Sequence, residues 1–282
     1  MLARGVAIVG AGRMGGGLAR ALAETGTPVS SLVRRDPVRD GSFFWPESRW
    51  LDALNAHRLV LIATPDDAIA SVARVLEASG AIQPDHVILH LSGLLDRTAL
   101  RALEGTGAAL GSFHPLQTVV DPATARERLR GAFAAVEGDP GAMAAGEALA
   151  RELGMHAVKV PSAGKADYHI GATIVANYSA ALLALGEQFA LRAGIEAELA
   201  EQLYRPLMTG AVANLAALGP TAALTGAIRR GDAATVAAHL ARLDGRERRL
   251  YCDLGMMALG VARAGGLDEA LAARIEAMLA AH

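Results

Sequence analysis

The feature that most constrains this chain is a glycine pattern near its N-terminus, Gly10-Ala11-Gly12-Arg13-Met14-Gly15. The apolar run Val6-Ala7-Ile8-Val9 before it predicts a buried strand, and residues 16–23 after it predict a helix. A strand, a tight glycine turn and a helix N-terminus together form a cradle for a pyrophosphate group. Gly10 allows the tight turn, Gly12 lets the backbone approach the phosphates, and Gly15 lets the helix pack close to the strand. The six residues therefore predict a dinucleotide site, with a glycine-rich turn in another α/β fold as the alternative.

The residues that follow the next expected strand bear on the choice of cofactor. Residues 28–33 predict that strand, and Arg34-Arg35 come directly after it. An NAD enzyme places an Asp or Glu there, about 20 residues beyond the glycines, on the ribose 2′-hydroxyl. Two guanidiniums instead match the oxygens of a 2′-phosphate, which predicts NADP(H). A solvated basic pair is one alternative, and Asp36 leaves NAD as another.

Alternating strand and helix patterns continue as far as Pro161. Strands are expected near residues 58–65, 86–91, 108–113, 133–138 and 156–160, the first of them buried, which predicts an α/β fold with a doubly wound, mostly parallel sheet. Ligands of such sheets bind outside the carboxyl ends of the strands. We therefore expect Thr64-Pro65, Ser92-Gly93 and His114-Pro115 to line one crevice, with Thr64 and Pro65 beside the cofactor.

Only helical patterns follow Pro161, at residues 165–193, 197–218, 233–243 and 246–264. The sequence thus predicts a dinucleotide-binding domain over residues 1–160 and an all-helical substrate and dimerisation domain over residues 161–282. Its helices are apolar on more than one side, a pattern typical of helices that bury a second face against a partner. We expect a homodimer through these helices.

Composition excludes several classes of partner. The net charge of −2 gives no reason to expect nucleic acid or an anionic membrane surface. A lone cysteine, Cys252, and a strand pattern that begins at once, with no signal peptide, favour a reducing, cytoplasmic location. Residues 170–190 are strongly apolar but contain Asn177, Glu187 and Gln188, so we expect a buried helix there and no membrane span.

A nicotinamide enzyme needs a proton donor or acceptor beside the reacting carbon. His114 and Ser92, each at the end of an expected strand, are candidates: His114 to polarise a carbonyl or exchange a proton, Ser92 to orient the substrate or the cofactor amide. The alternatives are a packed loop histidine and a simple turn serine. Gln117-Thr118 offers further donors for a carboxylate.

A second group of candidates lies on the first helix after Pro161. Lys165, His169, Thr173 and Asn177 are spaced four apart and share one helix face. A polar stripe on an apolar helix is costly to bury unless it is paired, which favours a polar ligand in the cleft, with bracing of the sheet as the alternative. Tyr168 and Tyr178 fall on neighbouring faces and are expected to pack.

The segment of residues 224–232 forms a basic connection between helices. It is interpreted as a helix C-cap followed by an N-cap, with a reach into the partner's active site as the alternative. The histidines are scattered, so no metal site is expected.

Taken together, the chain resembles NADP-dependent reductases with a Rossmann domain and a helical C-terminal dimerisation domain. That superfamily includes pyrroline-5-carboxylate reductase, 6-phosphogluconate and β-hydroxyacid dehydrogenases, ketopantoate reductase and prephenate dehydrogenase. Three stretches are most similar to a bacterial family of Rossmann-like oxidoreductases whose C-terminal domain has no known function: residues 111–117, residues 165–169 with 176–178, and residues 224–226 with 230–232. Lys165 matches the catalytic lysine of β-hydroxyacid dehydrogenases, although His169 stands where they carry an asparagine. His114-Pro115 and Ser92 resemble the pattern of prephenate dehydrogenases.

These observations lead to one functional hypothesis and its alternatives. The chain is expected to be an NADPH-dependent reductase of a small carboxylate-bearing carbonyl compound, a 2-oxo acid such as ketopantoate. Lys165 or His114 would polarise the carbonyl and supply the proton, and His169 and Asn177 would position the carboxylate or hydroxyl. Alternatives are a prephenate dehydrogenase-like or pyrroline-5-carboxylate/imine reductase-like enzyme and, in another class, a non-catalytic NADP-sensing protein.

Overall fold

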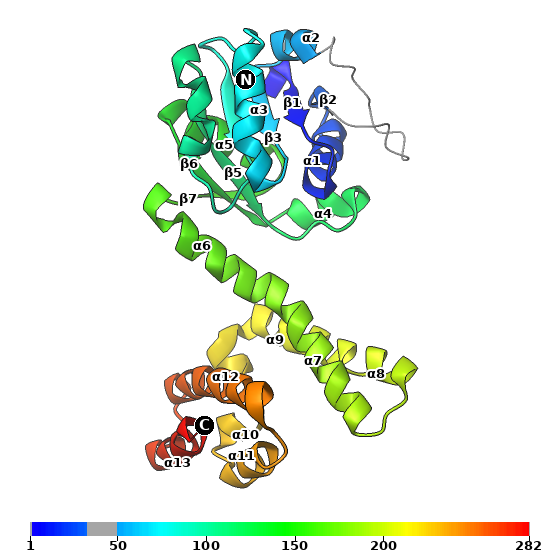
Figure 1. Ribbon diagram of the computed structural model, residues 1–282, viewed down its shortest axis with the longest axis vertical. Helices are drawn as coiled ribbons and strands as arrows, with labels where there is room; N and C mark the ends of the chain where they lie inside the picture. The colour runs from blue at the N-terminus through cyan, green and yellow to red at the C-terminus, as the bar shows by residue number, and fades with distance from the viewer. Residues whose placement is uncertain (1, 33–49, 282) are drawn as a thin grey trace. The chain divides into compact units, whose positions relative to one another are not determined.

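A computed structural model of the chain describes residues 2–32 and 50–281. The chain divides into two compact units, Met1–Ser179 and Ala180–His282 (Figure 1). All described elements after Lys159 are helical. The first unit nevertheless runs on to Ser179, because the first turn of the helix that begins at Lys165 contacts the sheet. A domain boundary at residue 160 stays a prediction.

The first unit is built on a seven-stranded sheet in the order β2-β1-β3-β4-β5-β6-β7. All neighbouring strands are parallel except β5 and β6, which confirms the predicted doubly wound, mostly parallel fold. One detail differs: the strand expected to stop before His114 continues through His114-Pro115, because both residues pair with β6. The strands are β1 (Val6–Val9), β2 (Val29–Leu32), β3 (Leu59–Ile62), β4 (Val87–His90), β5 (Ala109–Leu116), β6 (Phe133–Gly138) and β7 (His156–Lys159).

Helices cover both faces of this sheet, and the alternation of strand side chains divides the core between them. In β1, Val6 and Ile8 face one cluster, whereas Ala7 and Val9 face the other. Helices α1, α4 and α5 pack on the first face, and α2, α3 and the 3₁₀ helix Arg97–Thr106 pack on the second. The α-helices are α1 (Arg13–Glu24), α2 (Trp50–Ala56), α3 (Asp66–Ala78), α4 (Ala125–Leu129) and α5 (Pro140–Glu152).

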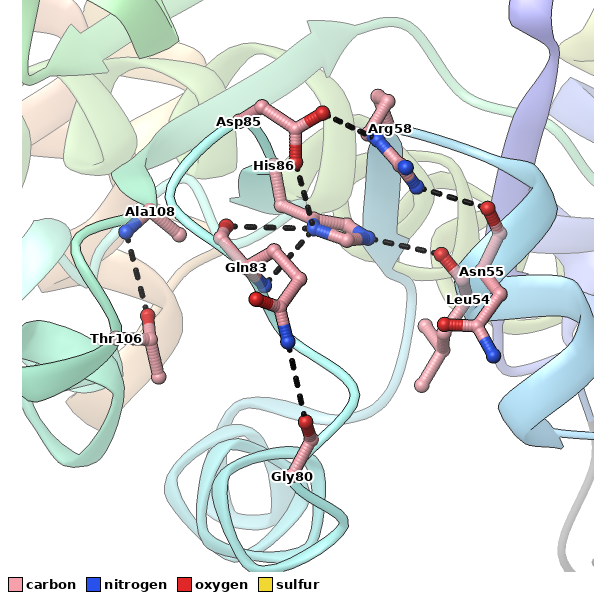
Figure 2. A network of polar contacts seen from close by, with 9 residues as sticks. All are labelled: Leu54, Asn55, Arg58, Gly80, Gln83, Asp85, His86, Thr106 and Ala108. Carbon is pink, nitrogen blue, oxygen red and sulfur yellow. Dashed lines mark hydrogen bonds and ion pairs between the residues drawn. The ribbon is translucent and has the colours of Figure 1, made fainter.

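A polar network holds the amino-terminal edge of the sheet (Figure 2). The N–H of Gln83 donates to His86 Nδ1 at 3.0 Å, so Nε2 donates to the Leu54 carbonyl at 2.8 Å. Arg58 Nε donates to the Asp85 carboxylate at 2.6 Å. These contacts tie α2 to the starts of β3 and β4. They lie at the edge opposite to the carboxyl ends of the strands, so they brace the fold and leave the ligand edge free.

A long helix follows the sheet and enters the second unit. It consists of α6 (Lys165–Ala172), a π-helical turn (Thr173–Asn177) and α7 (Tyr178–Arg192). Further helices make up the second unit, whose core lies between α11, α12 and α13 around Val236, Leu259 and Ile275. These helices are α8 (Ala197–Leu203), α9 (Arg205–Ala223), α10 (Gly226–Arg230), α11 (Ala233–Leu240), α12 (Gly245–Ala264) and α13 (Glu269–Ala280).

The expectation that residues 170–190 form a buried helix is wrong for the single chain. Ile174 and Val175 are 54% and 76% exposed, and Leu207 and Leu218 of α9 are 67% and 60% exposed. By length and composition alone, two helical stretches, Ser162–Arg192 and Ala197–Arg230, would be able to cross a membrane. Sequence patterns detect an apolar face but do not reveal whether the same chain covers it.

Candidate functional site

The carboxyl edge of the sheet collects the strand ends that the sequence singles out. Val9, Ile62, His90 and Ser112 occupy matched positions on β1, β3, β4 and β5. Each of these residues is followed two positions later by a residue at the carboxyl edge of the sheet. The four residues at this edge are Ala11, Thr64, Ser92 and His114. β1 and β3 flank the point where the strand order reverses, the usual place for a bound dinucleotide.

The glycines after β1 take the backbone roles that their spacing predicts. Gly10 has φ +109°, and a Cβ there would lie 2.7 Å from the Ala63 carbonyl oxygen. A Cβ on Gly15 would lie 2.1 Å from the Gly10 oxygen, so α1 packs directly on the turn. A Cβ on Gly12 would meet no atom within 4 Å. The turn therefore packs tightly against the protein at Gly10 and Gly15, whereas the space beside Gly12 is free. A phosphate-binding turn requires this free space beside its backbone.

A buried hydroxyl without a partner lies beside this turn. Thr64 Oγ1 is buried and has no hydrogen-bond partner among the described residues. The backbone nitrogen of Thr64 is 3.3 Å from the position of a Cβ on Gly10, so the hydroxyl belongs to the same turn region. An unpaired buried hydroxyl costs on the order of 1–3 kcal/mol, which a ligand hydrogen bond would recover. The open cradle and this hydroxyl together fit a dinucleotide.

The remaining cofactor candidates are less informative. Arg13 is exposed at the start of α1, and Met14 is partly buried against the core. Pro65 is exposed and precedes α3 as its N-cap residue. Arg34 and Arg35, the expected partners of a 2′-phosphate, lie outside the described residues.

Lys165 is buried at the start of α6, with only 2% of its surface exposed. Its Nζ donates to Ser112 Oγ at 2.7 Å and to the Ser92 carbonyl oxygen at 3.3 Å. Burial lowers the pKa of Lys165, and the carboxylates of Glu137, Asp96 and Asp66 oppose that shift. Lys165 therefore connects α6 to the ends of β4 and β5.

Glu137 on β6 completes this buried network. Its carboxylate accepts hydrogen bonds from Ser112 Oγ at 3.1 Å, from Ser162 Oγ at 2.9 Å and from the backbone N–H of Arg97 at 3.3 Å. Glu137 is 5% exposed. The ammonium of Lys165 and this carboxylate share Ser112 as a common partner, so two buried charges are linked through one hydroxyl.

His114 and Tyr168 form a second pair beside the network. His114 Nδ1 lies 2.8 Å from the Tyr168 hydroxyl, with the rings edge to face. His169 packs edgewise on His114 at 6.0 Å between ring centroids. Burial, aided by the nearby His169 and Lys165, lowers the pKa of His114 to about 4, so the imidazole is neutral at pH 7. Burial raises the pKa of Tyr168 to about 12.

The Ser92 hydroxyl is committed to its own loop. It donates to the Asp66 carboxylate at 2.7 Å and accepts the N–H groups of Leu94 at 3.1 Å and Leu95 at 2.9 Å. A hydroxyl has one proton and two lone pairs, so no hydrogen-bonding position is left for a substrate. Ser92 thus acts as a turn serine that holds the end of β4.

The four-residue stripe separates along the helix. Lys165 is buried and His169 is half-buried beside His114, whereas Asn177 is exposed. Thr173–Asn177 form the π-helical turn, in which hydrogen bonds span five residues, so a spacing of four no longer keeps side chains in line. Lys165 and His169 meet the edge of the sheet, and Asn177 lies farther along the helix.

Two other sequence candidates serve local structure. The Gln117 amide donates to the Arg128 carbonyl at 3.0 Å, and its oxygen accepts the N–H of Thr118. In the connection around residues 224–232, Gly231 ends α10 in the left-handed region and Asp232 caps α11. The interpretation as a C-cap followed by an N-cap is confirmed at Gly231-Asp232, but the expected connection contains a short helix, α10, over Gly226–Arg230.

Three residues of the site escaped the sequence analysis: Tyr168, Ser112 and Glu137. The sequence predicts only packing for Tyr168, yet its hydroxyl lies within hydrogen-bond distance of His114 Nδ1. Ser112 and Glu137 lie within strands, but both are polar residues in otherwise apolar runs, and β5 and β6 pair them directly. A buried carboxylate inside a strand is the signal that would have identified this network, because it requires partners.

Comparisons with known proteins agree with this architecture. Residues 132–258 match the family model described as domain of unknown function DUF2520. No curated protein matches the chain. Among solved structures, protein TM1727 from Thermotoga maritima has 22% identity and a TM-score of 0.68, over 92% of this chain and 98% of its own.

Two enzymes with NADP in their structures are similar at lower identity. Pyrroline carboxylate reductase of Plasmodium falciparum has 11% identity and a TM-score of 0.56, over 99% of both chains. An imine reductase from Myxococcus stipitatus has 16% identity and a TM-score of 0.55, over 98% of this chain and 93% of its own. The chain therefore has the fold of these dinucleotide-binding proteins.

Proposed function

We propose that the chain is an NADP(H)-dependent reductase of a small carboxylate-bearing carbonyl compound, with a 2-oxo acid such as ketopantoate as the first candidate. The observation that carries this proposal is the strand register, which aligns the glycine turn, Thr64 and His114 along one edge. The same edge would therefore hold the dinucleotide and offer the His114 imidazole as a hydrogen-bonding group for the reacting carbonyl.

The cofactor would lie across the strand ends. Gly10, Gly12 and Gly15 with the first turn of α1 would receive the pyrophosphate, and the Thr64 hydroxyl would gain its missing partner. Arg34 and Arg35 would contact the 2′-phosphate, as the sequence predicts. When bound, the nicotinamide supplies the hydride.

The chain's own residues would supply polarisation and orientation. Lys165 already donates to Ser92 and Ser112, so its ammonium would act as a nearby positive charge, and His114 would contact the reacting oxygen. His169 lies against His114, where it would orient the substrate carboxylate. A donor aimed at a developing oxyanion contributes on the order of 3 kcal/mol. Asn177 is exposed, so its predicted role would need a substrate that reaches beyond the first two turns of the helix.

The alternatives have a basis in the fold. The similar structures include a pyrroline carboxylate reductase and an imine reductase, which supports reduction of a C=N bond as the second candidate. A non-catalytic NADP sensor has no need of a second polar site, and the buried Lys165–Ser112–Glu137 network argues against it.

The apolar faces of α7 and α9 support the proposed homodimer. The exposed side chains on these helices, such as Leu207 and Leu218, would be covered by a second copy in a soluble, cytoplasmic protein without membrane association. Light scattering on protein purified without detergent would test this. A monodisperse dimer is expected, and a protein that needs detergent would contradict both parts.

The test of function is NADPH consumption with a panel of 2-oxo acids, ketopantoate included, and of cyclic imines and prephenate. We expect turnover with a 2-oxo acid. His114→Ala should remove most of it while NADPH binding is retained, and His156→Ala, on the exposed strand β7, serves as the matched histidine control. Turnover confined to imines would move the assignment to the second candidate. NADPH binding without turnover of any of these substrates would favour the sensor.

A further inference from the structure

The His114–Tyr168 pair contains one more proton than its own hydrogen bond uses. A neutral imidazole carries one N–H and a phenol carries one O–H, and only one of these protons lies between His114 Nδ1 and the Tyr168 oxygen. Neither side chain has another hydrogen-bond partner among the residues that the structure describes. The second proton is therefore available to a ligand, on His114 Nε2 or on the Tyr168 hydroxyl.

The relative basicity of the two groups decides which proton is shared. An imidazole nitrogen is a much stronger base than a phenol oxygen, so the O–H···N arrangement is the stronger of the two. In that arrangement Tyr168 donates to Nδ1, and the proton of His114 sits on Nε2. The half-buried position of both side chains favours the stronger bond, because little water competes for it.

We propose that Tyr168 is a positioning residue that fixes His114 in the Nε2–H tautomer, so that the pair presents one neutral hydrogen-bond donor to the carbonyl oxygen of the substrate. This inference rests on the proposed function. It also specifies the substrate class: a neutral donor stabilises an oxygen that becomes negative during hydride addition, whereas the nitrogen of a protonated imine has no lone pair to accept it.

The surroundings of His114 keep this donor uncharged. Tyr168 and His169 of α6 contact the ring, and Lys165 and Asp66 act on it through their charges. Lys165 and His169 disfavour a second proton on His114, and the opposing effect of Asp66 is the smallest of these. Gly93 provides the space, because a Cβ there would lie 2.9 Å from His114 Cε1 and 2.7 Å from His169 Cδ2.

The second unit contains a matched control pair. His239 Nδ1 lies 2.8 Å from the Tyr251 hydroxyl with rings at 89°, the same distance and angle as in the His114–Tyr168 pair. The control pair is exposed and joins α11 to α12 within the second unit. Pair geometry alone is therefore not a sign of function, and Tyr251→Phe removes an equivalent hydroxyl from the second unit while leaving both His114 and Tyr168 in place.

The experiment is ¹⁵N NMR of histidine-labelled protein at neutral pH without cofactor, with His114 assigned through His114→Gln. We expect wild-type His114 as the Nε2–H tautomer and Tyr168→Phe as a mixture of both tautomers, while Tyr251→Phe leaves His114 unchanged. A wild-type Nδ1–H tautomer, or a tautomer unaffected by Tyr168→Phe, would overturn the inference.

Turnover provides the second readout. Tyr168→Phe should lower kcat for the reduced carbonyl compound about tenfold with little change in KM for NADPH, and Tyr251→Phe should match wild type. Equal kcat for Tyr168→Phe and wild type would overturn the positioning role. A wild-type protein without NADPH turnover would overturn the proposed function, whereas the tautomer measurement still decides whether Tyr168 controls His114.

Discussion

Replacing Gly12 by alanine should separate cofactor binding from folding. Gly12 has φ −68° and ψ −172°, a conformation open to any residue, and its Cβ would meet no protein atom within 4 Å. The same change at Gly15 places a Cβ 2.1 Å from the Gly10 oxygen. Two glycines of one motif should therefore respond to the same substitution in different ways.

The magnitudes follow from this geometry. Gly12→Ala gains about 0.4–1 kcal/mol from the stiffer unfolded chain. It loses about as much because alanine is a poor N-cap residue, so the net change in the free energy of unfolding is near zero. Gly15→Ala should lower that free energy by about 1–3 kcal/mol through overpacking. NADPH affinity of Gly12→Ala should fall at least about tenfold, or 1.4 kcal/mol, because the new methyl group occupies the phosphate approach.

Denaturant unfolding followed by tryptophan fluorescence, combined with NADPH titration, measures both quantities. Gly16→Ala is the matched control, since its Cβ would meet only ordinary contacts of 3.6 Å and longer, and it should bind NADPH normally. If Gly12→Ala binds NADPH as tightly as wild type, or lowers the free energy of unfolding as much as Gly15→Ala, then the space beside Gly12 is not the phosphate site.

Two further predictions concern the buried polar groups. His114 keeps its folded-state pKa near 4 against an ordinary value of 6.5, so the first unit should lose about 3 kcal/mol of stability as pH falls from 6.5 to 4. Denaturant unfolding across that pH range should show this loss in wild type but not in His114→Gln. An equal dependence of the free energy of unfolding on pH in the two proteins would refute the prediction. Lys165→Met leaves Ser112 and the Ser92 carbonyl without their donor and should destabilise by about 3 kcal/mol. The Lys165→Met substitution should also raise the pKa of His114 in an NMR titration, because the positive charge of Lys165 lowers that pKa. A variant with wild-type stability and an unchanged pKa of His114 would contradict both expectations for Lys165.

The sequence predicts the fold well because its signals are local. The glycine spacing, the β-branched runs and the strand-end positions each reflect short-range geometry, and the alignment of Thr64, Ser92 and His114 follows from parallel strand register. Burial in the sheet is predictable for the same reason, because the apolar runs of the central strands face helices on both sides of the sheet. Burial of the apolar residues 170–190 is not predictable in this way, since side chains such as Ile174 and Val175 are exposed in the single chain.

The parts that could not be predicted depend on contacts between distant segments. Tyr168 contacts His114 although the two residues are 54 positions apart in the chain. Ser112 contacts Glu137 because β5 and β6 pair antiparallel, and no local sequence pattern predicts that pairing. The Ser92 hydroxyl stabilises its own loop because it donates a hydrogen bond to the Asp66 carboxylate on α3. The π-helical turn shifts Asn177 out of the stripe, and an i, i+4 pattern carries no sign of such a turn.

The proposed function depends on a preference for NADP(H), which a paired fluorescence titration with NADPH and NADH measures. Wild type, Arg34→Ala and the surface control Arg20→Ala on α1 would be compared. We expect wild type to bind NADPH more tightly than NADH, Arg34→Ala to lose this preference, and Arg20→Ala to keep it. Equal affinity of wild type for the two cofactors would refute the NADP(H) preference, and binding of neither would refute the dinucleotide site.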